Sequence, residues 1–253
     1  MKEAIALIKV ISDLIGVVIW PAVIVGGYFA FKPTLHDIVA GLPKAIGRMS
    51  KLKALGIEAE LTAQSDAITS ATLEQSAIVS DEQRDAAIKI ASKAEQLPLA
   101  EIRKTVRALA DEYESLRRVL PSGQQRTTEM TRVTAKMRAF SIAALPLLEE
   151  LEASESSGER LMAVAVLQVS PSMRHLDWLV ERFGKEQPFV FYQSSIALQN
   201  LVAANSDENA LGKLSEAVAS ACSILKGFSS GEPDRNTLQV LNSIQAQLSE
   251  MRR

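Results

Sequence analysis

The feature that most constrains this chain is an apolar run without a charged residue, Leu14–Phe31. Together with the mostly apolar stretch from Ile5, the run is long enough to cross the hydrocarbon core of a bilayer, about 30 Å thick, at about 1.5 Å per helical residue. A cleaved signal peptide is the competing interpretation, but the run is long for such a peptide, and the bulky Tyr28 occupies the −3 position of the best cleavage site. The sequence therefore predicts a transmembrane anchor within residues 1–32.

Charges on the two sides of the run predict its orientation. Upstream, Lys2 and Lys9 are balanced by Glu3 and Asp13. Downstream, Asp37 is outnumbered by basic residues, which are Lys32, Lys44, Arg48, Lys51 and Lys53. Because Lys and Arg resist translocation, we expect the N-terminus outside the cell and the large C-terminal part in the cytoplasm.

The predicted membrane helix has two patterned faces. Small residues recur every four positions on one face, and they allow transmembrane backbones to approach closely. A neighbouring stripe holds the only ionisable groups of the segment, which are four residues apart and able to pair. One hypothesis is that the two faces mediate self-association, with the polar stripe lining a path through an oligomer. The residues of this hypothesis are Lys9, Asp13, Gly16, Ala22, Gly26 and Ala30. The alternative places the ionisable pair among the outer headgroups; it is favoured because the two faces do not coincide and Pro21 predicts a kink.

Residues 33–62 follow as a juxtamembrane region. Apolar residues recur at helical spacing over 35–49, while Lys44, Arg48 and Lys51 lie on the opposite side. This pattern predicts an amphipathic helix on the inner membrane surface, where each basic residue contributes about 1 kcal/mol near anionic lipid. The alternative is a soluble helix that packs on the downstream domain.

One short β segment is predicted at Gly56–Leu61, where apolar residues alternate with period two. The strand needs a partner within the chain or in another subunit, because a lone strand leaves its backbone groups unpaired. Beyond residue 62 the apolar spacing is helical almost throughout, so the fold class is otherwise all-α.

A helical hairpin region is expected before residue 153. Ser80 and Gln83 match a capping box at the start of a first helix. A long helix should end at the turn Pro121–Gly123, and a second should run over 126–151, where Pro146 can bend the last turn.

The C-terminal part is predicted to contain four helices in two antiparallel pairs and a final capping helix, over 161–169, 173–183, 189–204, 211–228 and 234–251. Ser156 and Asn205 are the expected N-caps of the first and fourth helices. The dipeptides Leu167-Gln168 and Leu198-Gln199 fall at matching places, which is typical of two HEAT-like units. The predicted organisation is a membrane anchor, a juxtamembrane region, a hairpin region and a HEAT-like domain, at residues 1–32, 33–62, 63–152 and 153–253.

The composition argues against several classes of function. The chain has 28 basic and 30 acidic residues, so its net charge of −2 provides no bulk attraction for nucleic acid. It has two histidines, His36 and His175, and no sequence motif of a zinc protease, a P-loop or a dinucleotide-binding fold. Residues 227–231 match G-x-S-x-G, but a nucleophile elbow needs a preceding strand, so we interpret them as a linker. We therefore expect no enzymatic activity, no metal and no cofactor.

Three further features each have a structural and a functional interpretation. Cys222 is the only cysteine, which excludes an internal disulfide, and on an Ala-rich helix it is expected in the core. His175 is expected to be a surface or hydrogen-bonded histidine rather than a ligand. A solvated face is favoured over a calcium site for a group of acidic residues, Glu149, Glu150, Glu152 and Glu155.

A basic cluster surrounds the turn Pro121–Gly123. Where arginines flank a turn at a helix N-terminus, backbone N–H groups, the helix dipole and guanidinium groups together can hold an anion. This predicts a docking site for a phosphorylated ligand, nucleic acid or an acidic partner, formed by Arg117, Arg118, Ser122, Gly123, Arg126, Arg132 and Arg138. The alternative is a basic hairpin, including Lys136, whose cations pair with Glu112, Glu114 and Glu129.

The segments Tyr113–Arg138, Glu159–Leu179 and Pro188–Leu201 resemble a helical module of bacterial proteins that are similar to components of conflict and signalling systems, such as anti-phage defence. The membrane run and Lys51–Leu61 resemble a segment found behind membrane anchors in other bacterial proteins. The resemblance implies a non-enzymatic component of the bacterial inner membrane and no catalytic residues.

We therefore expect a single-pass membrane protein whose cytoplasmic helical domain senses a ligand or partner and acts by self-association, as an effector of a defence system. The expected partners are the lipid bilayer, further copies of the chain and a protein encoded nearby, with nucleic acid or a nucleotide as open candidates. The alternative is a passive anchor that recruits a soluble enzyme or a nucleic-acid complex to the membrane.

Overall fold

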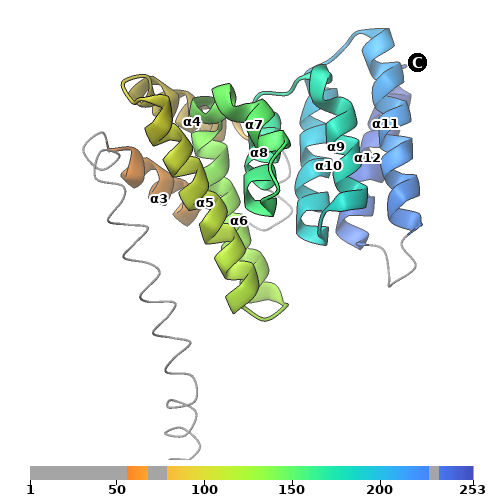
Figure 1. Cartoon of the computed structure of the whole chain (residues 1–253). Coiled ribbons are helices and arrows are strands. Elements are labelled where there is room, and N and C mark those ends of the chain that lie inside the picture. Colours follow the sequence, from red (N-terminus) through yellow and green to blue (C-terminus); the bar gives the residue numbers. More distant parts are fainter. Residues whose placement is uncertain (1–55, 68–78, 228–233, 253) are drawn as a thin grey trace, which may run out of the picture. The chain divides into compact units, whose positions relative to one another are not determined.

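The computed structural model describes residues 56–67, 79–227 and 234–252. Every regular element in these ranges is helical, which confirms the all-α class for this part of the chain (Figure 1). The elements are α3 (Ile57–Ala67), α4 (Asp81–Ala94), α5 (Leu99–Val119), α6 (Gln124–Ala144), η3 (Leu145–Leu147), α7 (Leu148–Glu152), α8 (Ser157–Val169), η4 (Met173–His175), α9 (Leu176–Lys185), α10 (Pro188–Ala203), α11 (Glu208–Lys226) and α12 (Arg235–Met251).

The predicted membrane anchor and amphipathic helix lie outside the described residues. The same holds for the residues assigned to self-association and to the membrane surface, which are Lys9, Asp13, Gly16, Ala22, Gly26, Ala30, Lys44, Arg48 and Lys51. Among the helices that are described, none combines the length and the apolar character that a membrane span requires. The membrane anchor therefore stays a prediction from the sequence.

The predicted β-strand at residues 56–61 is wrong, because α3 begins at Ile57. Gly56 precedes the helix with a positive φ of 69°. Ile57 and Leu61 lie four residues apart on one helix face and are buried, whereas Ala59 between them is exposed. Three alternating apolar residues therefore do not distinguish a strand from a helix whose buried positions recur every four residues.

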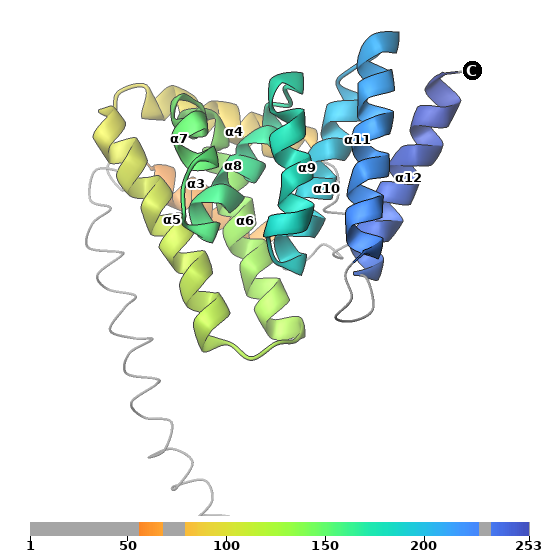
Figure 2. The same cartoon turned by 45° about the vertical axis from the view of Figure 1, so that its right-hand side comes forward.

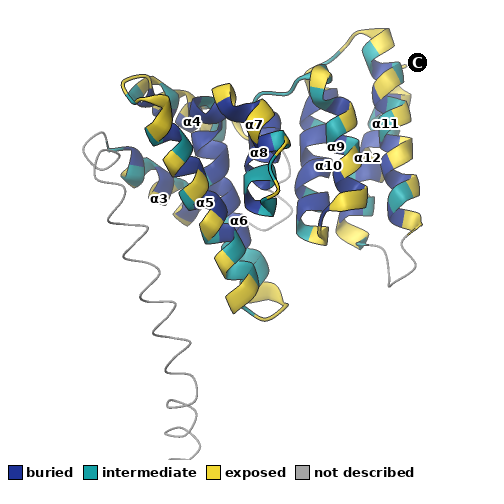
Figure 3. Ribbon diagram, viewed as in Figure 1, coloured by how far each residue is buried: buried dark blue, intermediate teal, exposed yellow. Residues whose placement is uncertain are grey.

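The second half of the structure is built from two rows of helices. Helices α6, α8, α10 and α12 pack side by side in one row, each against the next. Helices α9 and α11 pack against each other and form a second row, in which α9 contacts α10 and α11 contacts α12 (Figures 1 and 2). Helix α5 lies against α6 and α8. The hydrophobic core lies on the inward faces of these helices, as the burial colours in Figure 3 show.

Two antiparallel pairs are predicted among the helices at 161–169, 173–183, 189–204 and 211–228, and the structure shows which helices pack together. Helix α8 packs mainly against α5, α6 and α10, and the main pairs of consecutive helices after it are α9 with α10 and α11 with α12. The apolar pattern of a helix shows which face is buried, but it does not show which neighbour covers that face.

Helix α6 is surrounded by other helices, because α3, α4, α5 and α8 all pack against it. Most side chains in its second half are buried, including the polar Thr134 and Arg138. The single apolar face expected for this segment is thus only part of its buried surface. The helix ends at Ala144 rather than continuing to Leu151, and Pro146, which lacks an amide N–H, lies in the 3-10 turn η3 that follows.

The start of several helices follows the capping signals in the sequence. Ser80 and Gln83 form the predicted capping box of α4. Ser156 caps α8 as predicted, since its hydroxyl oxygen accepts a hydrogen bond from a backbone N–H of the first turn. For α11 the predicted cap is wrong: Asp207 occupies the N-cap position instead of Asn205.

Candidate ligand-binding cavity

A cavity of about 820 Å³ opens between the α5–α6 hairpin and helices α10 and α12. Its lining includes Arg117 of α5 and Arg126 and Arg138 of α6, together with aromatic and amide side chains of α10 and polar side chains of α12. The volume lies within the range of about 300–1,000 Å³ that is typical of small-molecule sites. Three of the seven residues predicted as a docking site therefore meet at one cavity.

One wall of the cavity is a single face of α6. Thr131, Thr134 and Arg138 recur at a spacing of three or four residues, and all three line the cavity. Each threonine hydroxyl donates a hydrogen bond to the carbonyl oxygen four residues earlier, at 2.8 and 2.9 Å. Because their protons are used within the helix, these hydroxyls have only oxygen lone pairs left for a ligand. This part of the wall therefore accepts hydrogen bonds rather than donating them.

Arg138 is the buried cation of the cavity, with an exposed fraction of 3%. Its Nε donates to Gln168 Oε1 at 2.5 Å and its Nη2 to Gln193 Oε1 at 3.0 Å. Gln168 donates in turn to the carbonyl oxygen of Gln193 at 2.7 Å, and Asn200 donates to the carbonyl oxygen of Gln168 at 3.1 Å. Burial lowers the pKa of the Arg138 guanidinium to about 10, so the group stays charged at neutral pH. A polar network joining α6, α8 and α10 thus holds a positive charge at the cavity.

Two partly exposed guanidinium groups line the same cavity. Arg126 Nη2 donates to Ser122 Oγ at 2.7 Å, which fixes this side chain against the turn that precedes α6. Arg117 lies over the ring of Tyr113, with its guanidinium carbon 5.8 Å from the ring centroid. The Tyr113 ring lies 5.9 Å from that of Phe189, which also lines the cavity. Arg117 and Phe189 therefore both line the cavity beside the Tyr113 ring.

The first turns of α6, α10 and α12 all contribute to the lining, through Arg126, Pro188 and Asn236 respectively. Helices α6 and α10 have no side-chain cap, whereas Asp234 caps α12 by accepting a hydrogen bond from the Asn236 backbone N–H at 3.2 Å. Uncapped N–H groups and the positive ends of helix dipoles favour negative charge. Among the described residues that line the cavity, Asp234 is the only carboxylate against three arginines.

Other members of the predicted docking site lie away from the cavity. Arg132 pairs with Glu129 at 2.5 Å, and Lys136 of the same cluster pairs with Glu112 at 2.8 Å. Arg118 is exposed and does not line the cavity. The alternative interpretation, a hairpin of paired charges, therefore describes part of the cluster.

The remaining residues of the cluster shape the turn or the helix packing. Ser122 accepts the hydrogen bond from Arg126, and Gly123 is the N-cap of α6, with a positive φ of 149°. Glu114, which we expected to pair with an arginine, accepts a hydrogen bond from Ser156 Oγ at 2.7 Å at the start of α8. This hydrogen bond holds the pKa of Glu114 below its ordinary value.

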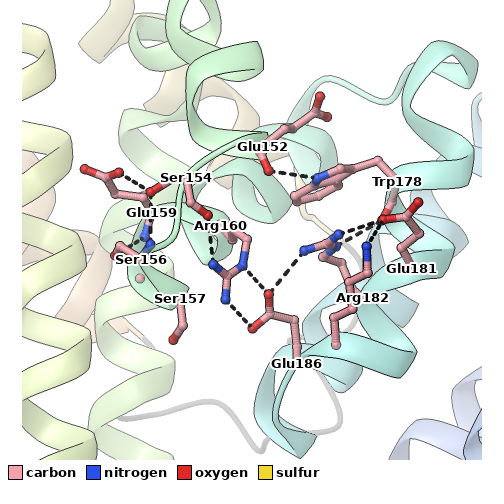
Figure 4. Close-up of polar contacts among 12 residues, drawn as sticks. Glu152, Ser154, Ser156, Ser157, Glu159, Arg160, Trp178, Glu181, Arg182 and Glu186 are labelled. Carbon is pink, nitrogen blue, oxygen red and sulfur yellow. Dashed lines mark hydrogen bonds and ion pairs between the residues drawn. The ribbon is translucent and has the colours of Figure 1, made fainter.

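A second group of charged side chains lies between α8 and α9 (Figure 4). Glu186, at the end of α9, is buried and accepts two hydrogen bonds from Arg160 of α8 and one from Arg182 at 3.3 Å. The Arg182 guanidinium lies over the Trp178 ring, 4.4 Å from its centroid. Trp178 Nε1 donates to the Glu152 carbonyl oxygen at 3.1 Å. Because these charges satisfy one another, we interpret this group as a structural link between the two helices.

The other residues that the sequence suggested take structural positions. Cys222 is buried, as predicted for a core residue, and burial raises the pKa of its thiol. His175 Nδ1 lies 2.6 Å from a carboxylate oxygen of Glu152, whose pKa is raised by burial. Glu149 and Glu150 form ion pairs with arginines. In the part of the chain that the structure describes, no group of three His, Cys, Asp or Glu side chains is arranged to hold a metal.

Sequence reasoning missed the contribution of α10 and α12 to the cavity. Phe189 and Tyr192 belong to an apolar helical pattern that predicts only burial. Gln199 lies in one of the two matching Leu-Gln dipeptides, and its Oε1 atom is buried without a hydrogen-bond partner in the described structure. The dipeptide was a signal of repetition in the sequence, but nothing in it indicated that Gln199 faces a cavity.

Comparisons with protein-family models, with curated proteins and with solved structures found no match to this chain. Its function is therefore inferred from the sequence and from the geometry of the cavity.

Proposed function

We propose that this chain is a single-pass protein of the bacterial inner membrane, whose cytoplasmic helical domain binds an anionic ligand or partner and acts through self-association of the membrane segment. The apolar run Leu14–Phe31 supports the membrane anchor, and the cavity supports the binding step. The resemblance to components of anti-phage systems favours a role as an effector in conflict with phage. The proposal requires no catalytic step.

The observation that carries this proposal is the concentration of positive charge at the cavity. Arg117, Arg126 and Arg138 line it with a single described carboxylate, Asp234, although the whole chain has a net charge of −2. Like charges gathered in one site repel one another, and a bound anion converts this repulsion into charge-assisted hydrogen bonds. A phosphorylated ligand or an acidic partner surface fits this arrangement.

The packing of α6 supports a coupling between the cavity and the N-terminal side of the domain. Helix α6 lines the cavity and also packs against α3. Helix α3 begins at Ile57, and its Glu60 forms ion pairs with Lys89 and Lys93 of α4, at 2.6 and 3.6 Å. A ligand that favours one position of α6 would also act on α3, which begins within the juxtamembrane region 33–62.

Crosslinking of the full chain in bacterial membranes tests the self-association step. We expect Gly26→Leu to lower the yield of crosslinked oligomer about fivefold, because a large side chain prevents close approach of two helices. The matched control is Ile24→Leu, which changes the opposite face of the predicted helix and should leave the yield unchanged. An unchanged yield for Gly26→Leu would exclude self-association along this face.

The same assay tests the link to the cavity through a pair of charge reversals. Arg126→Glu places a negative charge at the cavity, and we expect it to lower the oligomer yield in membranes from cells that contain the ligand. Arg118→Glu is the matched control, because Arg118 is exposed and lies outside the cavity lining. Equal yields for the two variants would show that the cavity does not control self-association.

Two measurements test the anchor, and a third separates the effector from the passive anchor. Alkaline carbonate should leave the full chain in the membrane pellet, and protease added outside spheroplasts should spare the helical domain. Replacing residues 1–32 with an unrelated transmembrane helix should abolish crosslinking if the segment is an effector. A passive anchor would tolerate the replacement.

A further inference from the structure

The two outer arginines of the cavity are suited to phosphate groups. Arg117 donates to Ser157 Oγ at 3.3 Å and Arg126 to Ser122 Oγ at 2.7 Å, so both are positioned by neutral hydroxyls. Within the described ranges, neither guanidinium forms an ion pair. The first turn of α6, which has no side-chain cap, lines the same cavity through Arg126. Guanidinium groups and free helical N–H groups are the usual donors to phosphate oxygens.

Part of the cavity lining offers hydrogen-bond acceptors to a ligand. Thr131 and Thr134 have spent their hydroxyl protons on their own helix, and Gln199 Oε1 is buried without a partner in the described residues. A buried acceptor without a donor is unfavourable, and a ligand N–H or O–H group would satisfy it. A bare phosphate, a nucleic-acid backbone or an acidic peptide segment presents mainly further acceptors at this point.

The dimensions and the ring surfaces of the cavity restrict the ligand further. Phe189 and Gln199 are ten residues apart on α10, which corresponds to about 15 Å along the helix axis. This length suits an extended nucleoside with more than one phosphate. The rings of Phe189 and Tyr192 both line the cavity and offer apolar faces for a planar base.

We propose that the cavity binds a nucleoside di- or triphosphate, with its phosphates at Arg117 and Arg126 and its base near Tyr192 and Gln199. The inference rests on the proposed function, because it names the class of anion that the cavity receives. The base supplies ring faces and N–H donors, the ribose supplies hydroxyl donors, and the phosphates neutralise the outer arginines. The acceptor-lined wall and the carboxylate of Asp234 disfavour a longer polyanion.

Equilibrium filter binding of radiolabelled ATP to the full chain in detergent micelles tests the inference. Unlabelled competitors separate the parts of the ligand: we expect ATP and ADP to compete at least about tenfold better than AMP, adenosine or inorganic triphosphate. Inorganic triphosphate that competes as well as ATP would show a simple anion site and overturn the inference. Absence of ATP binding at millimolar concentration would also overturn it.

Three single variants locate the two ends of the ligand. We expect Arg126→Ala to weaken ATP binding about tenfold and Arg118→Ala, the exposed control, to leave it unchanged. Gln199→Leu should weaken ATP binding about fivefold, whereas the affinity for inorganic triphosphate, measured by competition, should stay unchanged. An unfolding midpoint measured for each variant excludes a loss of fold. Equal effects of the two arginine variants, or no effect of Gln199→Leu, would overturn the assignment.

Failure of this inference and failure of the proposed function give different results. Loss of self-association in the Gly26→Leu membranes tests the membrane mechanism without any nucleotide. If ATP does not bind but Arg126→Glu still changes crosslinking, the cavity has another anionic partner and only the nucleotide assignment is refuted. If ATP binds and crosslinking never changes, the nucleotide site stands and the proposed membrane mechanism is refuted.

Discussion

Gly158, the second residue of α8, lies directly against the backbone of α5. A Cβ atom at this position would lie 2.5 Å from the carbonyl oxygen of Ala110 and 2.8 Å from its Cα. These are backbone atoms, so no change of side-chain rotamer relieves the contact. An ordinary van der Waals contact begins at 3.4 Å, so the helices would have to separate by about 0.9 Å. The separation would also stretch the hydrogen bond from the Gly158 N–H to Glu114 Oε1, now 3.2 Å.

The free energies of these effects can be added for Gly158→Ala. Overpacking of this kind costs about 1–3 kcal/mol, and weakening the hydrogen bond to Glu114 adds about 1 kcal/mol. Alanine returns about 0.5–1 kcal/mol because it loses less backbone entropy than glycine in a helix. We therefore expect the free energy of unfolding to fall by about 1–3.5 kcal/mol. At about 2–4 °C per kcal/mol, the unfolding midpoint should fall by about 2–14 °C.

Thermal unfolding of the full chain in detergent, followed by far-UV circular dichroism, measures this shift. The matched control is Gly212→Ala in α11, where an added Cβ meets nothing within 4 Å. That variant should keep or raise the midpoint, because alanine at this position can add up to about 1 kcal/mol to the free energy of unfolding. If Gly158→Ala and Gly212→Ala shifted the midpoint alike, the close approach of α5 and α8 would be refuted.

Three further changes probe the described structure. Glu186→Ala leaves two largely buried guanidinium groups without their shared carboxylate and should lower the free energy of unfolding by about 3–5 kcal/mol in urea titrations. Glu181→Ala should cost less, about 1 kcal/mol, because the Glu181 carboxylate is half-exposed, although it pairs with Arg182 as well as with Lys185. The Ser156 hydroxyl holds the pKa of folded Glu114 below 4.5, so the ionised carboxylate stabilises the fold above about pH 4.5, and this stabilisation is lost as the pH falls further. Glu114→Gln should lack this part of the pH dependence of the free energy of unfolding. Gly123→Ala should lower the melting midpoint, since a positive φ strains alanine by about 1–3 kcal/mol.

The sequence predicted those features that depend on neighbouring residues. The capping box of Ser80 and Gln83 and the cap at Ser156 are formed within one helical turn, so a short motif specifies them. Pro188 marks the start of α10 for the same reason, because proline is compatible with the first helical position. Arg117 and Arg126 of the cavity were also recognisable, since they flank a single turn of the hairpin.

The sequence did not predict features that depend on distant segments. The alternation at Ile57 and Leu61 indicated a strand until the packing of α3 on α6 defined which face is buried. Asp234 and Phe189 meet Arg126 only because α12 and α10 stand in the same row as α6, and no local spacing encodes that meeting. Arg138 was predicted as a residue of the docking site, but nothing in the sequence indicated that it is almost fully buried.

Arg138 connects the stacking of the helices with the cavity. Its guanidinium spans α6, α8 and α10 through Gln168 and Gln193, and a buried polar network of this kind is satisfied only when the three helices stand in one register. The same side chain lines the cavity. A ligand that contacts Arg138 would therefore act on the group that holds α6 in the row, and α6 packs in turn against α3. This shared residue gives ligand binding a physical route to the N-terminal side of the helical domain, where the proposed membrane mechanism requires a response.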